Sequence, residues 1–261
     1  MVKCIGSHIR PPEETAQWLE LAGENDTGYR LARINIPLAN LCADAQALFD
    51  STVRNEDWIL GLMHIIKEAI VLDIRFEGWR EEAYEVWPYH KLRKGSPLSN
   101  ASEYAPAIQQ TAPPHIYHDI WVAHVWNRYR CCRLHLHEVL LHCLDLLHSH
   151  PATSKLSIDT QTIRDQSAST IADLLSDVCD SVPFCIGDID SAGNPLDPSK
   201  KIALHGHLLI WPLYVISVSV EPDSIRGRWI RENLSYISKV LGFHKAQLLA
   251  NRVRKGPWDL S

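Results

Sequence analysis

The sequence lacks the short motifs that mark the common nucleotide-binding and hydrolytic sites. It contains no GxGxxG, no GxxxxGK[ST], no GxSxG and no HExxH. The glycine-rich phosphate loops, the serine nucleophile turn and the helical zinc site of metalloproteases are therefore absent in their usual sequence form. The spacing of the Ser, Cys, His and Asp residues supports no nucleophile–base pair either. We predict no catalytic residues, and the sequence favours a protein that is not an enzyme.

Long apolar runs and an excess of positive charge are also missing. The longest apolar stretch, 208–220, is shorter than the roughly 18 residues of a transmembrane helix and contains Pro212. No apolar segment follows a basic N-terminal start, which argues against a secretory signal. Lys and Arg number 26 against 31 Asp and Glu, a formal net charge of −5, whereas gripping phosphate backbones needs clustered positive charge. We expect no membrane association and no direct DNA binding by this chain.

Cysteine is present in an odd number and in no repeating spacing. Most of the seven Cys residues lie within apolar helical patterns. This is typical of buried thiols in a reducing compartment and not of a disulfide framework. The adjacent pair Cys131 and Cys132 would point about 100° apart on a helix, so we interpret both as core residues.

Proline and glycine are absent from 115–148, which predicts one long central helix. At about 1.5 Å per residue such a helix spans roughly 50 Å, and many other helices must pack on it. One apolar stripe is predicted to face the core, formed by Trp121, Val125, Tyr129, Cys132, Leu136, Val139, Cys143 and Leu147.

Helical periodicity continues through nearly all of the other segments. We predict an all-α fold, a single multi-helix domain over 1–261 with about eight helices around the central helix 115–148. A long loop is predicted at 84–114, where several Pro residues and a Ser/Asn cluster interrupt the pattern. The other helices are predicted at 12–23, 29–51, 58–82, 157–180, 203–218 and 224–241, with 243–253 closing the fold.

Two of these helices carry residues that set their shape. Pro37 removes a backbone donor inside 29–51 and predicts a kink or a break there. Gly242 follows 224–241 and predicts a left-handed helix cap. The segment 203–218 is nearly all apolar, so we expect it to be buried on all sides.

A polar row on the central helix is the first candidate for function. It is formed by Asp119, Trp126, Arg130, Arg133 and His137, which share a narrow arc. Because an unpaired buried Arg is costly, the row predicts either a network of paired charges between helices or the floor of a pocket for an anionic ligand. The network is the favoured interpretation.

A second polar row carries potential metal ligands. His135, Glu138 and His142 face roughly one way at i, i+3 and i+7. A carboxylate-bridged metal site, however, needs matching ligands from a facing helix, and no other segment supplies the corresponding pattern. We expect a solvated row of His residues, and we predict no metal and no cofactor.

Five stretches, taken in order, resemble one family. The run WVAHVWNRYRCCRLHLHEVLL (121–141) is similar to the W-x-A-x-x-W-N-x-Y-R-x-x-R-x-x-L-H-E-x-L-L pattern in the C-terminal regulatory half of fungal zinc-cluster (Zn2Cys6) transcription factors. The resemblance covers most of the chain. The other four stretches are IIKEAIVLDIRFEGWREEAYEVWPY (65–89), SDVCDSVPFCIG (176–187), GHLLIWPLYVIS (206–217) and RGRWIRENLSYISKVLGFHKAQLLANRV (226–253).

The resemblance implies an all-helical domain of transcriptional control, located in the nucleus or the cytoplasm. In the family this half senses signals or contacts partners and has no shared catalytic residues. The implied partner is a full-length transcription factor or a second copy of this chain. The family reads DNA through a zinc cluster that begins Cys-x2-Cys-x6-Cys, but the first 100 residues here hold only Cys4 and Cys42. The DNA-reading module is therefore lacking, whether the chain is a fragment, a shortened gene product or a stand-alone relative.

Two alternatives stay open beside the regulatory interpretation. The first is a small-molecule-binding protein or enzyme of fungal secondary metabolism built on the same helical shell. The second is a pure interaction module that forms a heterodimer with a full-length factor. The first would need a deep pocket ringed by Trp126, Arg130, Arg133, His137 and Trp211.

Overall fold

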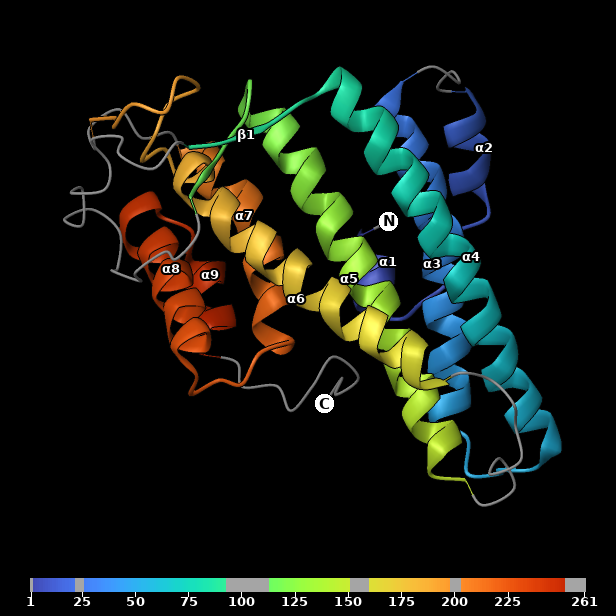
Figure 1. The fold of residues 1–261 in the computed structure, drawn as a ribbon. Coiled ribbons are helices and arrows are strands. Elements are labelled where there is room, and N and C mark those ends of the chain that lie inside the picture. Colours follow the sequence, from blue (N-terminus) through green and yellow to red (C-terminus); the bar gives the residue numbers. More distant parts are fainter. Residues whose placement is uncertain (1, 22–25, 93–112, 151–159, 198–202, 252–261) are drawn as a thin grey trace. The chain divides into compact units, whose positions relative to one another are not determined.

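The computed structural model describes residues 2–21, 26–92, 113–150, 160–197 and 203–251. Within these ranges most residues are helical, and the strands form one short antiparallel pair. This confirms the predicted all-α fold class. No helix in the same ranges is long and apolar enough to cross a membrane. The helices, drawn in Figure 1, are α1 (Val2–Gly6), α2 (Glu14–Leu21), α3 (Thr27–Phe49), α4 (Glu56–Val86), α5 (Ile120–His148), α6 (Thr160–Cys185), α7 (Ala203–Val218), α8 (Ile225–Leu241) and α9 (His244–Ala250).

The contacts within the chain define two compact units. Unit 1 takes in 1–86 and 132–174, and so contains α1 to α4, the later part of α5 and the earlier part of α6. Unit 2 takes in 87–131 and 175–259, with the earlier part of α5, the end of α6 and α7 to α9. The prediction of one single domain stays a prediction.

Unit 1 is built on α3 and α4, which lie side by side (Figure 1). Both helices begin at side-chain caps. The Asp26 carboxylate accepts hydrogen bonds from the backbone N–H groups of Gly28 and Tyr29, and Asn55 Oδ1 accepts from Trp58 N. Their buried faces repeat every three or four residues, as expected for helices half-covered by a core. These faces include Leu31, Ile34, Leu38, Leu41 and Ala45 on α3, and Leu62, Ile65, Ala69, Leu72 and Phe76 on α4.

A kink or a break is predicted at Pro37, and the break is not present, since α3 runs as one helix from Thr27 to Phe49. Pro37 removes a single backbone donor. The buried residues Ile34 and Leu38 on either side of it keep the helix packed, and this tertiary packing outweighs the local loss.

The central helix begins later than the sequence pattern suggests. The segment 115–148 is predicted to be helical throughout, but α5 begins at Ile120. Asp119 Oδ1 accepts from the backbone N–H groups of Trp121 and Val122, which caps the helix. Burial would raise the pKa of Asp119, but the bonds from Val122, Trp121 and neighbouring His118 outweigh it and lower that pKa.

The residues before that cap form half of a short sheet that the periodicity did not reveal. β1 (His90–Lys91) pairs antiparallel with β2 (His115–Ile116), and Lys91 lies opposite His115. Leu92 N also donates to Pro114 O. The predicted loop 84–114 is therefore shorter at its start, because α4 continues to Val86. Its middle, 93–112, lies outside the described residues, as do 157–159 of the helix predicted at 157–180.

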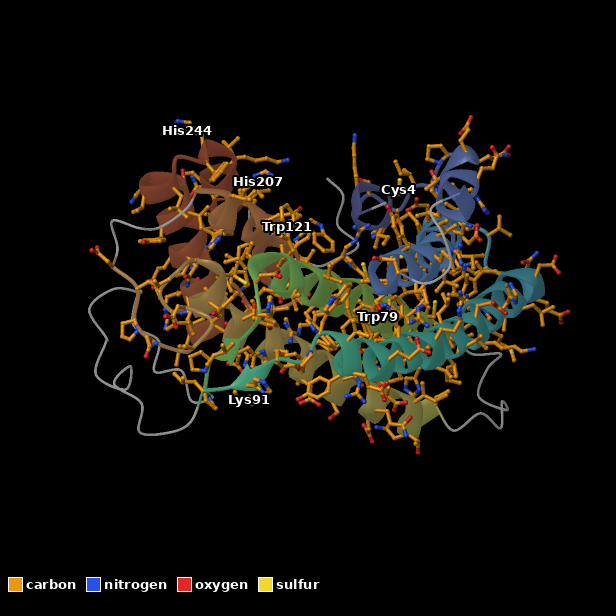
Figure 2. The ribbon with its side chains drawn as sticks, turned by 90° about the horizontal axis from the view of Figure 1, so that it is seen from above. Cys4, Trp79, Lys91, Trp121, His207 and His244 are labelled. Carbon is orange, nitrogen blue, oxygen red and sulfur yellow. The ribbon has the colours of Figure 1, made fainter. Side chains whose placement is uncertain are left out.

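The apolar stripe of α5 is buried with two exceptions at its start. Val125 is half-buried, and Trp121 is 57% exposed. Trp121, labelled in Figure 2, lies at the beginning of α5. Ile74, an apolar residue of α4, is likewise exposed. Helical periodicity identifies the side of a helix but not how far along that side the neighbouring elements reach. The buried members of the stripe are Tyr129, Cys132, Leu136, Val139, Cys143 and Leu147.

Unit 2 is completed by α7, α8 and α9, which pack on one another. Leu209, Leu213 and Ile216 are fully buried, but Leu204 in the first turn of α7 is exposed. The expectation that this helix is buried on all sides is therefore wrong, since His207 is also exposed and Trp211 and Tyr214 are half-buried. Ser224 Oγ accepts from Gly227 N and caps α8. Gly242 has φ +83°, so the predicted left-handed cap is confirmed.

The buried thiols are also as expected. The seven Cys residues form no disulfide bond with one another, and Cys42, Cys131, Cys132, Cys143 and Cys185 are buried. Burial raises the pKa of Cys143 to about 12. The Cys143 thiol therefore stays protonated at neutral pH, and the buried Cys residues serve as small core residues.

Gly242→Ala should destabilise the protein, because a Cβ at positive φ is strained even where space is free. No heavy atom lies within 4 Å of a Cβ at Gly242, so the expected loss is about 1 kcal/mol of unfolding free energy from the backbone alone. Gly78→Ala is the matched control, since Gly78 lies within α4 and its Cβ would also meet nothing within 4 Å. It should stabilise by about 0.5–1 kcal/mol. Urea denaturation measures both, and equal effects of the two changes would contradict this explanation.

Candidate functional site

The guanidinium of Arg130 lies at the centre of a buried polar network in unit 2. Its side chain is 1% exposed. The NH1 group donates to Tyr117 Oη at 2.7 Å and to Asn127 Oδ1 at 2.9 Å. NH2 lies 3.4 Å from His115 Nδ1. Arg130 therefore donates its hydrogen bonds to other side chains of unit 2.

Aromatic rings surround the same cation. Arg130 Cζ lies 5.0 Å from the ring centre of Tyr89 and 5.8 Å from those of Tyr117 and Trp126. These distances are within the range of cation–π attraction. Trp126 is held in place because its Nε1 donates to Trp87 O at 2.9 Å. The rings replace part of the hydration that Arg130 loses on burial.

Two carboxylates on one face of α6 complete this environment. Arg130 Nε lies 3.7 Å from Asp177 Oδ2. Burial raises the pKa of Asp180 to about 6, and the Asp177 charge adds to the rise, against the lowering effect of Lys91, Arg130 and Arg226. Near neutral pH a fraction of Asp180 is therefore protonated, while Asp177 supplies the countercharge of Arg130.

His115 is a further titratable group of this network. Burial, together with the positive charges of Arg130 and Lys91, lowers the pKa of His115 to about 2. The imidazole is therefore neutral at physiological pH. Its Nδ1 lies 3.2 Å from Tyr117 Oη, and its Nε2 lies 3.7 Å from Asp177 Oδ1.

These residues form a group that the sequence pattern did not predict. Among the described residues, His115, Asp177 and Asp180 are the three side chains whose ligand atoms come close enough to hold a metal ion. The predicted row of potential ligands lies on one helix, whereas His115 lies on a strand. The available signal was the pair Asp177 and Asp180, two acids three residues apart on the buried side of a helix.

Arg133 forms a separate network in unit 1. Its Nε donates to Asp73 Oδ1 at 2.6 Å, and its NH1 donates to Glu77 Oε1. His137 Nε2 lies 3.0 Å from the same Asp73 oxygen. Burial alone would raise the pKa of Asp73, but the hydrogen bonds from His137 and Arg133 outweigh it and lower that pKa to about 2. Asp73 and Glu77 are one turn apart on α4, which gives Arg133 two acceptors.

The predicted site residues therefore fall into three places. Trp126 and Arg130 belong to the network of unit 2, and Arg133 and His137 belong to the network of unit 1. Trp211 lies half-buried on α7. In both networks the Arg donors bond to protein groups, as the favoured interpretation of paired charges required.

The second polar row is more buried than expected. His135 and Glu138 are buried, and His135 Nδ1 lies 3.1 Å from Glu138 Oε2. The ring of His142 makes an edge contact with Phe49, with ring centres 4.4 Å apart. The prediction of a solvated row is wrong for His135 and Glu138, which pair with each other within the core.

A hollow on α8 and α9 is a further surface feature of unit 2. Its volume is about 610 Å³, and its charged lining residues are Arg228, Arg231, Glu232 and Lys239. The predicted ligand-binding residues do not line it. Three basic residues and one acidic residue line this open depression, and none of them is buried.

Comparison with known protein families, curated proteins and solved structures found no match for this chain.

Proposed function

We propose that this chain is a transcriptional regulatory domain of the kind found in fungal zinc-cluster transcription factors, acting without a DNA-binding module of its own. Its role is to sense a ligand or to bind a protein partner in the nucleus. The resemblance in sequence is the basis of this proposal. The five similar stretches fall on the helical framework in order, because they include parts of α4, α5, α6, α7, α8 and α9.

The observation that carries the proposal is the position of the central similar stretch. Its residues Trp126, Asn127 and Arg130 all make buried contacts within unit 2, and Asn127 Nδ2 donates to Ser181 Oγ at 2.8 Å. Ser181 belongs to another of the similar stretches. The resemblance therefore rests on residues that determine the fold, and not on surface composition.

The hydrogen bonds donated by Arg130 and Arg133 favour a regulatory role over an enzymatic one. A pocket for an anionic ligand needs Arg donors that face an opening. Here Arg130 bonds to Tyr117 and Asn127, and Arg133 bonds to Asp73 and Glu77. The geometry thus supports a structural framework whose surface contacts other molecules.

A tethering experiment tests the regulatory role. The whole chain is fused to an unrelated DNA-binding domain, and expression of a reporter gene carrying that domain's target site is measured in fungal cells. We expect expression to change severalfold relative to the DNA-binding domain alone. His118→Ala, a surface change at an 88% exposed side chain, should keep the effect. An unchanged reporter, with the fusion shown to be folded and nuclear, would contradict the proposal.

The chain alone should show no sequence-selective binding to duplex DNA. The net charge is −5, and phosphate contacts without base readout weaken steeply as salt rises. In a mobility-shift assay at about 150 mM salt, any weak complex should be removed equally by specific and by random competitor DNA. Selective retention of one sequence under these conditions would show that the chain reads DNA itself.

A further inference from the structure

Three potential metal ligands converge in unit 2, beside Arg130. His115 lies on β2, and Asp177 and Asp180 lie three residues apart on α6. Each offers one ligand atom, and these atoms all lie within 4.8 Å of one another. We propose that His115, Asp177 and Asp180 bind one divalent transition-metal ion, with Zn²⁺ preferred. This site is independent of the proposed regulatory role, and it replaces the expectation of no metal.

The His115 imidazole distinguishes this group from an ordinary acidic cluster. Its side chain is 0% exposed, and its Nε2 has no hydrogen-bond partner among the described residues. Nε2 is directed at Asp177 Oδ1 but remains 3.7 Å away, which is too far for a hydrogen bond. Buried polar atoms are rarely left without a partner. A metal ion between Nε2 and the two carboxylates would supply the missing one.

The other ring nitrogen has the support that a metal-ligating imidazole needs. His115 Nδ1 lies 3.2 Å from Tyr117 Oη. When Nδ1 carries the proton and donates it to this oxygen, Nε2 keeps its lone pair for a metal. In this tautomer Nδ1 no longer accepts from Arg130 NH2, which lies 3.4 Å away. Such a bond fixes both the tautomer and the ring orientation. Arg130 NH1 donates to the same oxygen at 2.7 Å, which holds the hydroxyl in place.

The donor set selects the type of ion. One imidazole and two carboxylates match a zinc site with three protein ligands and an open fourth position. Mg²⁺ and Ca²⁺ prefer all-oxygen surroundings, and Mn²⁺ binds mixed sites more weakly than Zn²⁺. Zinc–ligand bonds are about 2.0–2.2 Å long, so the ligand atoms must move closer together as the ion enters. Asp177, with 31% exposure, provides the path from solvent.

Nearby positive charges limit the expected affinity. Arg130, Lys91 and Arg226 all act on Asp180, and their field opposes an incoming cation. The two carboxylates together balance the charge of one divalent ion. We therefore expect an affinity in the micromolar range, weaker than that of a zinc finger.

Metal titration of the purified full chain tests the site. After treatment with a chelator and its removal, Zn²⁺ is titrated against a chromophoric chelator, and Co²⁺ absorption reports the ligand field. The wild type should bind one equivalent of Zn²⁺, with Mn²⁺ and Mg²⁺ much weaker, and Zn²⁺ should raise its melting temperature. His115→Ala and Asp180→Asn should each weaken Zn²⁺ binding by about tenfold or more. Binding of Co²⁺ should give weak bands typical of nitrogen and oxygen ligands.

Two control variants distinguish this site from metal binding by other His and Asp side chains. His118→Ala and Asp173→Asn change exposed residues on the same short stretches of chain, and both should bind Zn²⁺ as the wild type does. Where Asp180→Asn fails to fold, Asp177→Asn is measured instead by the same titration. Absence of Zn²⁺ binding by the wild type would overturn the proposal. It would be overturned equally by binding that survives His115→Ala, or by Co²⁺ bands with the intensity of thiolate ligation.

Discussion

Arg130→Ala should lower the free energy of unfolding by about 3–5 kcal/mol, the expected range for breaking a buried charged pair. The change leaves Tyr117 Oη, Asn127 Oδ1 and the Asp177 carboxylate without their cation. It also empties the space between three aromatic rings. Since small domains are stable by about 5–15 kcal/mol, the melting temperature should fall strongly.

Arg128→Ala is the matched control for this experiment. Arg128 is half-buried on the same helix, two residues from Arg130. Removal of this half-buried side chain should cost about 1 kcal/mol, well below the cost at Arg130. Arg130→Lys should not restore the wild-type stability, because one ammonium group cannot reproduce the planar fork that reaches Tyr117 and Asn127 together. Thermal melting followed by circular dichroism measures all three variants.

The same measurement separates the structural interpretation from a ligand pocket. If Arg130 instead lined a site for an anion, the empty protein would tolerate its loss, and only ligand binding would suffer. Unchanged melting temperatures for both Arg130→Ala and Arg133→Ala would favour the pocket, and with it a small-molecule binder or an enzyme.

The helical fold could be read from the sequence because its signals are local. Apolar residues recur on one face of α5, and Gly242 marks a helix end by its own conformational preference. The start of α5 could not be read in the same way. The residues His115 and Ile116 pair with β1, some 25 residues earlier in the chain. A helical pattern does not indicate such a distant pairing partner.

The candidate site was only partly readable for the same reason. A helical projection correctly singled out Arg130 and Arg133, and burial of Arg predicted paired charges. The projection also placed the two residues in one row, although their partners differ. Arg130 bonds to Tyr117 and Asn127, whereas Arg133 bonds to residues of α4 that are 56 and 60 positions away. Partners at that separation follow from the tertiary fold and not from periodicity.

Arg133→Ala should lower the free energy of unfolding of the protein by about 3–5 kcal/mol. The side chain of Arg133 is 10% exposed, and those of Asp73 and Glu77 are 25% and 33% exposed. Removal of Arg133 would leave the Asp73 and Glu77 carboxylates, one turn apart on α4, without the cation that they share. Glu77 would keep its pair with Arg80, and Asp73 its contact with His137. Arg30→Ala is the control, because its ion pair with Glu82 is exposed (40% and 55%). An exposed pair contributes about 0–1 kcal/mol.

The acid response of this variant gives an independent readout. The pKa of Asp73 is lowered to about 2 in the folded protein, against about 3.9 in an unfolded chain. Its contribution to stability is therefore complete above about pH 5 and is lost as the pH falls towards 2. In Arg133→Ala the folded-state pKa of Asp73 should rise, which flattens the pH dependence of stability over this window. Urea denaturation at several pH values measures the slope, and a wild-type slope in Arg133→Ala would show that Arg133 does not hold the Asp73 carboxylate in its charged form.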